Sequence, residues 1–278
     1  MSTSLLTQFQ NDGYLILEKF NSAKSCDDLM HRAEELVRNY NIQDHPSIFQ
    51  TSNQSASTDD YFLRSGNEIS FFFEKDAFDK NGKLIGDTFH SLNKIGHALH
   101  DLDPLFNSFS RSPQMTKIAS DLEMDEYVII QSMMIFKHAK IGGVVDVHQD
   151  STFLYTEPDS CIGFWFALED ATVNNGCLWA KPGGHQTNLR TRFRRKEGGG
   201  TEMQILDEEH ISLEGMIPLE VKKGDCIVLH GLLPHFSKPN TSGISRQAYS
   251  IHTIRKGTNY PMDNWLRRDM NSLRGFTI

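Results

Sequence analysis

The sequence lacks the features that mark several large classes of protein. Its four cysteines include no CxxC pair, so we expect them to be reduced and buried as small hydrophobic residues. Its apolar runs, such as Ile162–Leu168, are far shorter than the roughly 20 residues that a membrane-spanning helix needs. Basic residues are outnumbered, with 28 Lys and Arg against 36 Asp and Glu and a net charge of −8. Because binding to nucleic-acid phosphates requires clustered cations, we expect no nucleic-acid partner. The short apolar runs likewise lead us to expect no membrane partner.

Targeting segments are equally scarce. Residues 1–10 contain neither a basic stretch nor a long apolar stretch, so no secretory signal is indicated. The C-terminal Phe276-Thr277-Ile278 does not match the Ser-Lys-Leu type of peroxisomal address. We therefore expect a cytoplasmic protein, and we expect it to be monomeric.

The 278 residues show no internal repeat, and their patterning changes part-way along the chain. Residues 1–125 are mainly of helical pattern, with strands expected at 14–17 and Ile69–Phe73 and a helix at Leu92–Leu99. From 126 to 255, short β-rich runs alternate with turn residues. This order predicts an α+β protein, in which N-terminal and flanking helices accompany a double-stranded β-helix core (a cupin-like jelly roll). We expect residues 1–278 to form a single domain, with 188–200 as a mobile basic loop.

The strongest local motif is His148-Gln149-Asp150. In a strand, residues two apart point to the same face, so the imidazole and the carboxylate converge. Such a pair is a candidate for metal binding. Asp146 lies on the same face and is an alternative carboxylate, with a solvent-exposed or supporting position as its other interpretation.

His235 and Arg246 flank the loop-forming segment 239–243 symmetrically. A hairpin turning there would place the two side chains opposite each other on adjacent strands. His230 is a competing histidine, but it would need a less favourable turn. Two histidines and a carboxylate with open coordination positions are typical of non-haem Fe(II) oxygenases. A nearby guanidinium suits the binding of an acidic co-substrate.

Further short motifs extend over nearly the whole chain. They are Asp12-Gly-Tyr-Leu-Ile-Leu, Phe71-Phe-Phe-Glu-Lys, Asn93-Lys-Ile-Gly-His, Gln131-Ser-Met-Met-Ile-Phe, Asn174-Asn-Gly-Cys-Leu-Trp, Pro182-Gly-Gly-His and Ser245-Arg-Gln-Ala-Tyr. Together with His148-Gln-Asp, they resemble the phytanoyl-CoA dioxygenase family of Fe(II)/2-oxoglutarate oxygenases. The resemblance implies an enzyme that converts 2-oxoglutarate and O₂ to succinate and CO₂ while it hydroxylates a small organic substrate. Ascorbate is expected to support turnover, and an acyl-CoA substrate is doubtful.

The resemblance also implies roles for individual residues. His148, Asp150 and His235 would bind Fe(II), and Arg246 would bind the distal carboxylate of 2-oxoglutarate. The pocket for this co-substrate would be lined by Lys94, Met133, Trp165 and Ser237. Of these four, Ser237 also follows from spacing, because it lies two residues beyond His235 on the same strand face.

Other interpretations remain open at this point. A jelly roll that binds 2-oxoglutarate or a metal without catalysis would use the same residues, and a zinc hydrolase shares the three-ligand open site. The basic run 190–196 is either a binding surface for coenzyme A phosphates or a solvated loop. His252, in phase with Arg246 along a strand, is either a substrate contact or a core residue.

Overall fold

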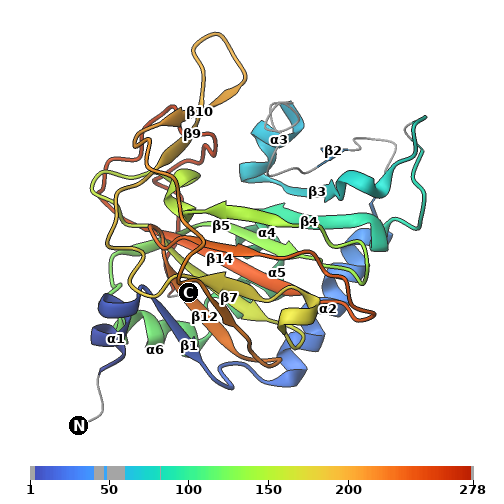
Figure 1. Ribbon diagram of the computed structural model, residues 1–278, viewed down its shortest axis with the longest axis horizontal. Coiled ribbons are helices and arrows are strands. Elements are labelled where there is room, and N and C mark those ends of the chain that lie inside the picture. Colours follow the sequence, from blue (N-terminus) through green and yellow to red (C-terminus); the bar gives the residue numbers. More distant parts are fainter. Residues whose placement is uncertain (1–3, 41–46, 49–59, 82, 277–278) are drawn as a thin grey trace.

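The computed structural model describes residues 4–40, 47–48, 60–81 and 83–276. Residues 1–3 and 277–278, the ends of the stretches considered for targeting signals, lie outside this part. Two mainly antiparallel sheets enclose a cavity. Helices cover the outer face of the larger sheet (Figure 1). The predicted α+β class with a jelly-roll core is confirmed. Every helix in the described ranges is too short or too polar to cross a bilayer.

The large sheet holds eight strands in the part of the chain that the structure describes. In spatial order they are β1 (Tyr14–Leu17), β12 (Cys226–His230), β7 (Ile162–Ala167), β14 (Ala248–Arg255), β5 (Tyr127–Ile135), β4 (Leu92–His97), β3 (Ile69–Phe73) and β2 (Ser47–Ile48). All neighbours are antiparallel except β2 and β3. The central strand β7 is buried along its whole length, which explains its unbroken apolar sequence.

The smaller sheet completes the jelly roll. Its strands are, in order, β11 (Ile217–Leu219), β8 (Leu178–Ala180), β13 (His235–Ser237) and β6 (Val145–His148). Apolar residues of both sheets, such as Trp165 and Leu178, pack between them at one end. A separate hairpin of β9 (Thr191–Arg195) and β10 (Thr201–Ile205) projects beyond the sheets. A cavity lies between the two sheets, and residues of this hairpin also line it.

Helices close the other face of the large sheet. They are α1 (Leu5–Asp12), α2 (Ala23–Arg38), α4 (Leu99–Leu102), α5 (Pro104–Ser110) and α6 (Pro113–Asp121). The short helix α3 (Asp60–Arg64) instead packs through Phe62 against Trp265 and borders the cavity on the inner side. Ser22 and Ser112 cap α2 and α6 by accepting backbone N–H bonds, as their residue types favour. Leu29 of α2 and Phe106 of α5 belong to the same core as Phe164 of β7. This face of the sheet is thus sealed, and chemistry is confined to the inner face.

Two local predictions are wrong. Residues Leu92–Leu99 were expected to be helical, but they form β4 and only the start of α4. Pairing with both β3 and β5 satisfies the backbone of this segment, and such long-range pairing overrides helical spacing. Residues 188–200 were expected to be a loop, but they contain β9 and its turn to β10. Gly198, Gly199 and Gly200 make that turn with φ values of 90°, 109° and 75°, which favour glycine.

Candidate active site

A cavity of about 820 Å³ lies between the two sheets. Strands β4, β5, β7 and β14 of the large sheet form its floor, and β6, β8 and β13 form the facing wall. The β9–β10 hairpin and the segment 207–211 border its outer end. This volume is in the range of small-molecule sites in proteins. Every one of the eight predicted site residues lines it.

His148, Asp150 and His235 meet at one point of this cavity. His148 ends β6 and His235 begins β13, and the two lie directly opposite each other in the pairing of these strands. The ligand atoms of the three side chains all lie within 4.8 Å of one another. Asp146 is outside this group although it lines the cavity, and His230 packs elsewhere, against Phe9. Of the alternatives that the spacing left open, the structure therefore favours Asp150 and His235.

Backbone hydrogen bonds orient both imidazoles. His148 Nδ1 lies 2.8 Å from the carbonyl oxygen of Asp146, and His235 Nδ1 lies 2.9 Å from that of Leu233. When neutral, each ring therefore carries its proton on Nδ1 and presents the lone pair of Nε2. The Nε2 atoms lie 3.5 and 3.6 Å from Asp150 Oδ1. In metal sites, a hydrogen bond from the other ring nitrogen usually fixes the tautomer of a ligating histidine in the same way.

The protonation states also suit metal binding. Burial lowers the pKa of His235 to about 4, so its ring is neutral at physiological pH. Burial opposes ionisation of Asp150, but His235, His252 and His148 outweigh it and hold the pKa of this carboxyl well below its ordinary value. For His148, burial lowers the pKa, and the hydrogen bond and charge of Asp150 more than reverse this effect. A divalent cation would replace the proton that this cluster attracts.

The predicted hairpin between His235 and Arg246 is wrong. His235 belongs to the smaller sheet, and Arg246 lies two residues before β14 of the large sheet. The Arg246 backbone N–H donates to the carbonyl oxygen of Lys137, next to β5. The two residues therefore line the cavity from different sheets. Between His235 and Arg246 the chain crosses from the smaller sheet to the large sheet, and it does not turn back in a hairpin.

Arg246 is a buried cation with unused donors. Its side chain is among the largest fully buried ones, and its Nε and Nη1 make no hydrogen bond within the described residues. Burial lowers the pKa of Arg246 to about 10, which leaves it charged at neutral pH. The buried hydroxyl of Ser237 also has no partner in the same part of the chain. A buried charge without partners is costly, so this end of the cavity is suited to an anion.

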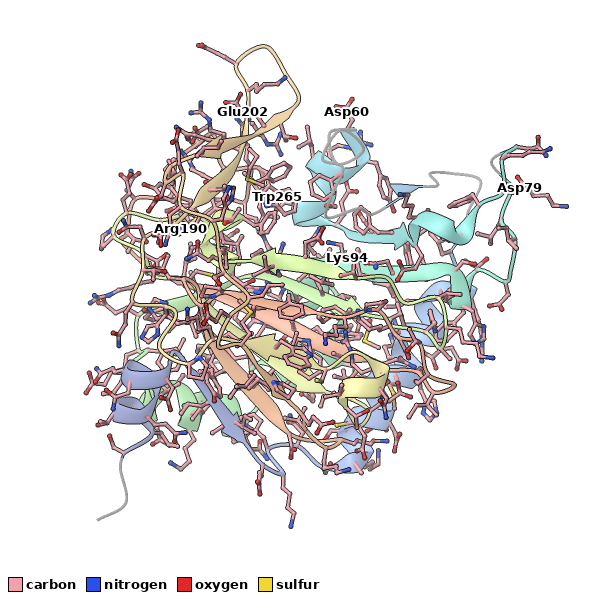
Figure 2. All side chains as sticks on the ribbon, in the orientation of Figure 1. Asp60, Asp79, Lys94, Arg190, Glu202 and Trp265 are labelled. Carbon is pink, nitrogen blue, oxygen red and sulfur yellow. The ribbon has the colours of Figure 1, made fainter. Side chains whose placement is uncertain are left out.

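Lys94, Met133 and Trp165 lie on the inner face of the large sheet. The Lys94 Nζ is 3.7 Å from Met133 Sδ, and Figure 2 labels Lys94 on β4. The Trp165 ring lies 5.2 Å from the guanidinium of Arg246, a cation–π distance. Trp165 therefore lies at the same end of the cavity as Arg246, and Lys94 and Met133 lie next to each other on the cavity floor. All three residues are predicted from the resemblance alone. Burial lowers the pKa of Lys94 to about 7.

The replacement Lys94→Met is expected to stabilise the ligand-free protein in a pH-dependent way. The pKa of Lys94 is about 7 in the fold and 10.5 as an ordinary lysine. The buried ammonium therefore destabilises the fold fully below about pH 7, and this penalty disappears as the pH approaches the ordinary value. The Tm of Lys94→Met should exceed that of the wild type clearly at pH 6 and much less at pH 9. Thermal unfolding at the two pH values measures the difference.

The exposed Lys80→Met variant is the control for the loss of a lysine. It should leave the Tm nearly unchanged at both pH values. A Tm gain of Lys94→Met that is equal at pH 6 and pH 9 would contradict the assignment of a buried, titrating ammonium.

An aromatic wall was missed in the sequence. Phe153 packs 5.8 Å from the His148 ring and 5.8 Å from Phe193, by ring centroids. Phe62 stacks on Trp265 at 4.4 Å, and both rings also line the cavity. Figure 2 labels Trp265. These rings come from separate segments of the chain with no common motif, so no sequence pattern could have assembled them.

The basic run 190–196 is neither an open phosphate site nor a solvated loop. Arg190 forms ion pairs with Asp207 and, at 2.6 Å, with Glu209. Arg192 pairs with Asp263, and Arg194 pairs at 2.7 Å with Glu202. Figure 2 labels Arg190 and Glu202 beside the hairpin. The sequence showed the cations but not their distant carboxylate partners.

Comparison with known proteins agrees with this site. The sequence model of a family described as phytanoyl-CoA dioxygenase matches residues 9–248. The chain belongs to the phytanoyl-CoA dioxygenase family. A protein named phytanoyl-CoA dioxygenase from Arabidopsis thaliana is 44% identical over 263 residues, covering 94% of this chain and 91% of that protein. Phytanoyl-CoA dioxygenase domain-containing protein 1 from Bos taurus is 41% identical over 276 residues, covering 96% and 95%.

Solved structures share the fold at low sequence identity. EctD from S. alaskensis, in a structure with 2-oxoglutarate and 5-hydroxyectoine, gives a TM-score of 0.64 at 18% identity and covers 97% of this chain and 84% of that chain. The α-ketoglutarate-dependent carbocyclase SnoK gives 0.62 at 17% identity and covers 94% and 86%. As a member of the phytanoyl-CoA dioxygenase family, the chain is an oxidoreductase that uses iron and 2-oxoglutarate.

Proposed function

We propose that this protein couples the oxidation of 2-oxoglutarate to the hydroxylation of a small organic molecule that is not a coenzyme A thioester. His148, Asp150 and His235 hold Fe(II), and Arg246 holds 2-oxoglutarate. The observation that carries the proposal is the joint placement in one cavity of a three-ligand cluster and a buried guanidinium whose Nε and Nη1 make no hydrogen bond among the described residues.

The three ligands are of the right type and number for this chemistry. Two neutral imidazoles and one carboxylate leave coordination positions open for a co-substrate and O₂. Iron supplies the oxidising chemistry when bound: 2-oxoglutarate loses CO₂ to give succinate, and the second oxygen atom of O₂ enters the substrate as a hydroxyl group. The chain supplies the ligand geometry, the orientation of both substrates and an enclosed site. Ascorbate is expected to sustain turnover by keeping the metal ferrous.

The anionic co-substrate matches the other end of the cavity. Arg246 and Ser237 offer N–H and O–H donors that nothing else uses in the described chain. A carboxylate accepting them would form charge-assisted bonds inside an apolar environment, where such bonds are strongest. Trp165 and Met133 add apolar walls along the carbon chain of 2-oxoglutarate, and Lys94 adds a further donor.

The outer end of the cavity is unsuited to coenzyme A. Arg190 is bound by two carboxylates, and Asp146 and Glu208 add negative charge to the lining. A coenzyme A thioester would bring several phosphate charges to this acidic rim and gain no available guanidinium. Desolvated like charges repel by several kcal/mol, so we expect selection against thioesters. The aromatic wall instead favours a compact, apolar substrate body.

A succinate-release screen tests the proposal. The purified protein with Fe(II), ascorbate and 2-oxoglutarate should produce succinate slowly without a second substrate. Uncharged or amine-bearing small molecules should raise this rate, and acyl-CoAs should not. Matching free acids serve as the comparison for each thioester. Stimulation by an acyl-CoA, with a hydroxylated thioester as product, would overturn the choice of substrate class; the absence of any succinate would overturn the proposal itself.

A further inference from the structure

His252 lies on the inner face of the large sheet, next to the metal ligands. It belongs to β14, as Ser250 does, and lies six positions after Arg246 in the sequence. At the usual rise of a strand, this is about 20 Å. His252 lines the cavity and is buried, with 7% of its surface exposed. It therefore lies far from Arg246 along the large sheet, at the part of the cavity where Asp150 is.

The imidazole of His252 contacts the oxygen of Asp150 that faces away from the other histidines. His252 Nε2 lies 3.3 Å from Asp150 Oδ2, whereas His148 and His235 approach Oδ1. The carboxylate thus has one oxygen for the metal and one oxygen toward His252. A Cβ at Gly163, which pairs with His252 across β7 and β14, would come within 3.1 Å of Asp150 Oδ2 and 3.4 Å of His252 Nε2. Glycine at this position leaves room for the contact.

The other nitrogen of the same ring has no partner. His252 Nδ1 is buried and makes no hydrogen bond within the described residues. In the tautomer whose proton is on Nε2, toward the carboxylate, Nδ1 is an acceptor. A buried acceptor without a donor is costly and calls for a ligand group. The cavity that His252 lines is also walled by Phe153, Phe193 and Trp265, which offer apolar surface and ring faces.

We propose that His252 fixes the single-oxygen orientation of Asp150 through Nε2, and that its Nδ1 accepts a hydrogen bond from a hydroxyl or amine of the substrate. His252 is thus a positioning residue for the metal site and a specificity residue for the substrate. The expected substrate has an apolar body against the aromatic wall and a hydrogen-bond donor directed at this ring. This inference rests on the proposed function, whose iron ligands it supports.

Two substitutions separate the two roles of the ring. In His252→Gln the amide nitrogen reaches the position of Nε2, so the contact with Asp150 is kept and the Nδ1 acceptor is lost. In His252→Asn the amide lies near the position of Nδ1, so an acceptor is kept and the contact with Asp150 is lost. The matched control is His138→Gln, which changes another buried histidine with an unpartnered nitrogen, outside the cavity lining.

The first measurement is the affinity for Mn(II) as an iron substitute, in the presence of 2-oxoglutarate, from the electron paramagnetic resonance signal of free Mn(II). His252→Asn should weaken binding by about tenfold, the lower end for loss of a residue that orients a metal ligand. His252→Gln and His138→Gln should stay within about threefold of the wild type. Equal affinity of His252→Asn and wild type would overturn the positioning role. Failure of the wild type to bind Mn(II) would instead overturn the proposed function.

The second measurement compares benzyl alcohol with benzyl methyl ether, which lacks the hydrogen-bond donor. Paramagnetic broadening of their proton signals by the Mn(II)-loaded protein reports binding near the metal. The wild type, His252→Asn and His138→Gln should prefer the alcohol by about tenfold, the effect of satisfying one buried acceptor. His252→Gln should lose this preference. Equal broadening by both compounds in the wild type, or none by the alcohol, would overturn the substrate-contact role.

Discussion

Replacing Asp150 with alanine is expected to reduce iron-dependent succinate formation to below about a thousandth of the wild-type rate. Asp150 is the anionic ligand of the cluster, and its Oδ1 lies 3.5 and 3.6 Å from the Nε2 atoms of His148 and His235. Without it, two neutral imidazoles remain, which bind a divalent hard cation weakly. His148→Ala should have an effect of the same size. Succinate is measured after incubation with Fe(II), ascorbate and saturating 2-oxoglutarate.

The matched control is Asp146→Ala. Asp146 lies on β6, two residues before His148, and lines the same cavity without belonging to the cluster. The His148 ring binds the backbone carbonyl oxygen of Asp146, which the substitution keeps. Asp146→Ala should therefore retain most of the basal succinate formation. Near-native turnover by Asp150→Ala, or loss of turnover by Asp146→Ala alone, would reject the assignment of the carboxylate ligand.

Two of the three metal ligands could be predicted from the sequence because they are close together along the chain. His148 and Asp150 are two residues apart, and the alternation of a strand is enough to suggest that they converge. The detail differs, since Asp150 already begins a short 3-10 helix after β6. The sequence also offered His235 with a better turn than His230. The reason behind that choice was wrong, because β13 pairs with β6 and β8, while β14 lies in the other sheet.

Properties set by distant partners were less accessible. Lys94 sits on β4, a segment with helical spacing that becomes a strand because β3 and β5 lie on either side of it. From the sequence alone, the arginines of 190–196 resemble an unpaired basic surface. The fold pairs Arg190 with Asp207 and Arg192 with Asp263, which are distant in the sequence. His252 was in phase with Arg246, but only the fold reveals that Asp150 reaches it. In each case the residue could be singled out from the sequence, but its neighbours are set by the tertiary structure.

The replacement Arg246→Met is expected to raise the dissociation constant of 2-oxoglutarate by about 100-fold, because a buried charge pair with two donors is lost. The same variant should have a higher Tm than the wild type without ligand, since a buried cation with two unused donors is replaced by an apolar side chain. Opposite effects on ligand binding and stability are expected only if the guanidinium is kept for an anion. Calorimetric titration with Mn(II)-loaded protein and thermal unfolding provide the two values.

Lys137 provides the comparison, because it is a buried cation whose carbonyl oxygen accepts the backbone N–H of Arg246. Its ammonium group donates to the carbonyl oxygens of Gly143 and Lys238, at 2.6 and 2.9 Å. Lys137→Met leaves these acceptors without their donor, so it should lower the Tm and change the affinity for 2-oxoglutarate by less than about threefold. If Arg246→Met also lowered the Tm and left the affinity for 2-oxoglutarate intact, Arg246 would be a structural cation of the same kind as Lys137, and the anion site would have to lie elsewhere in the cavity.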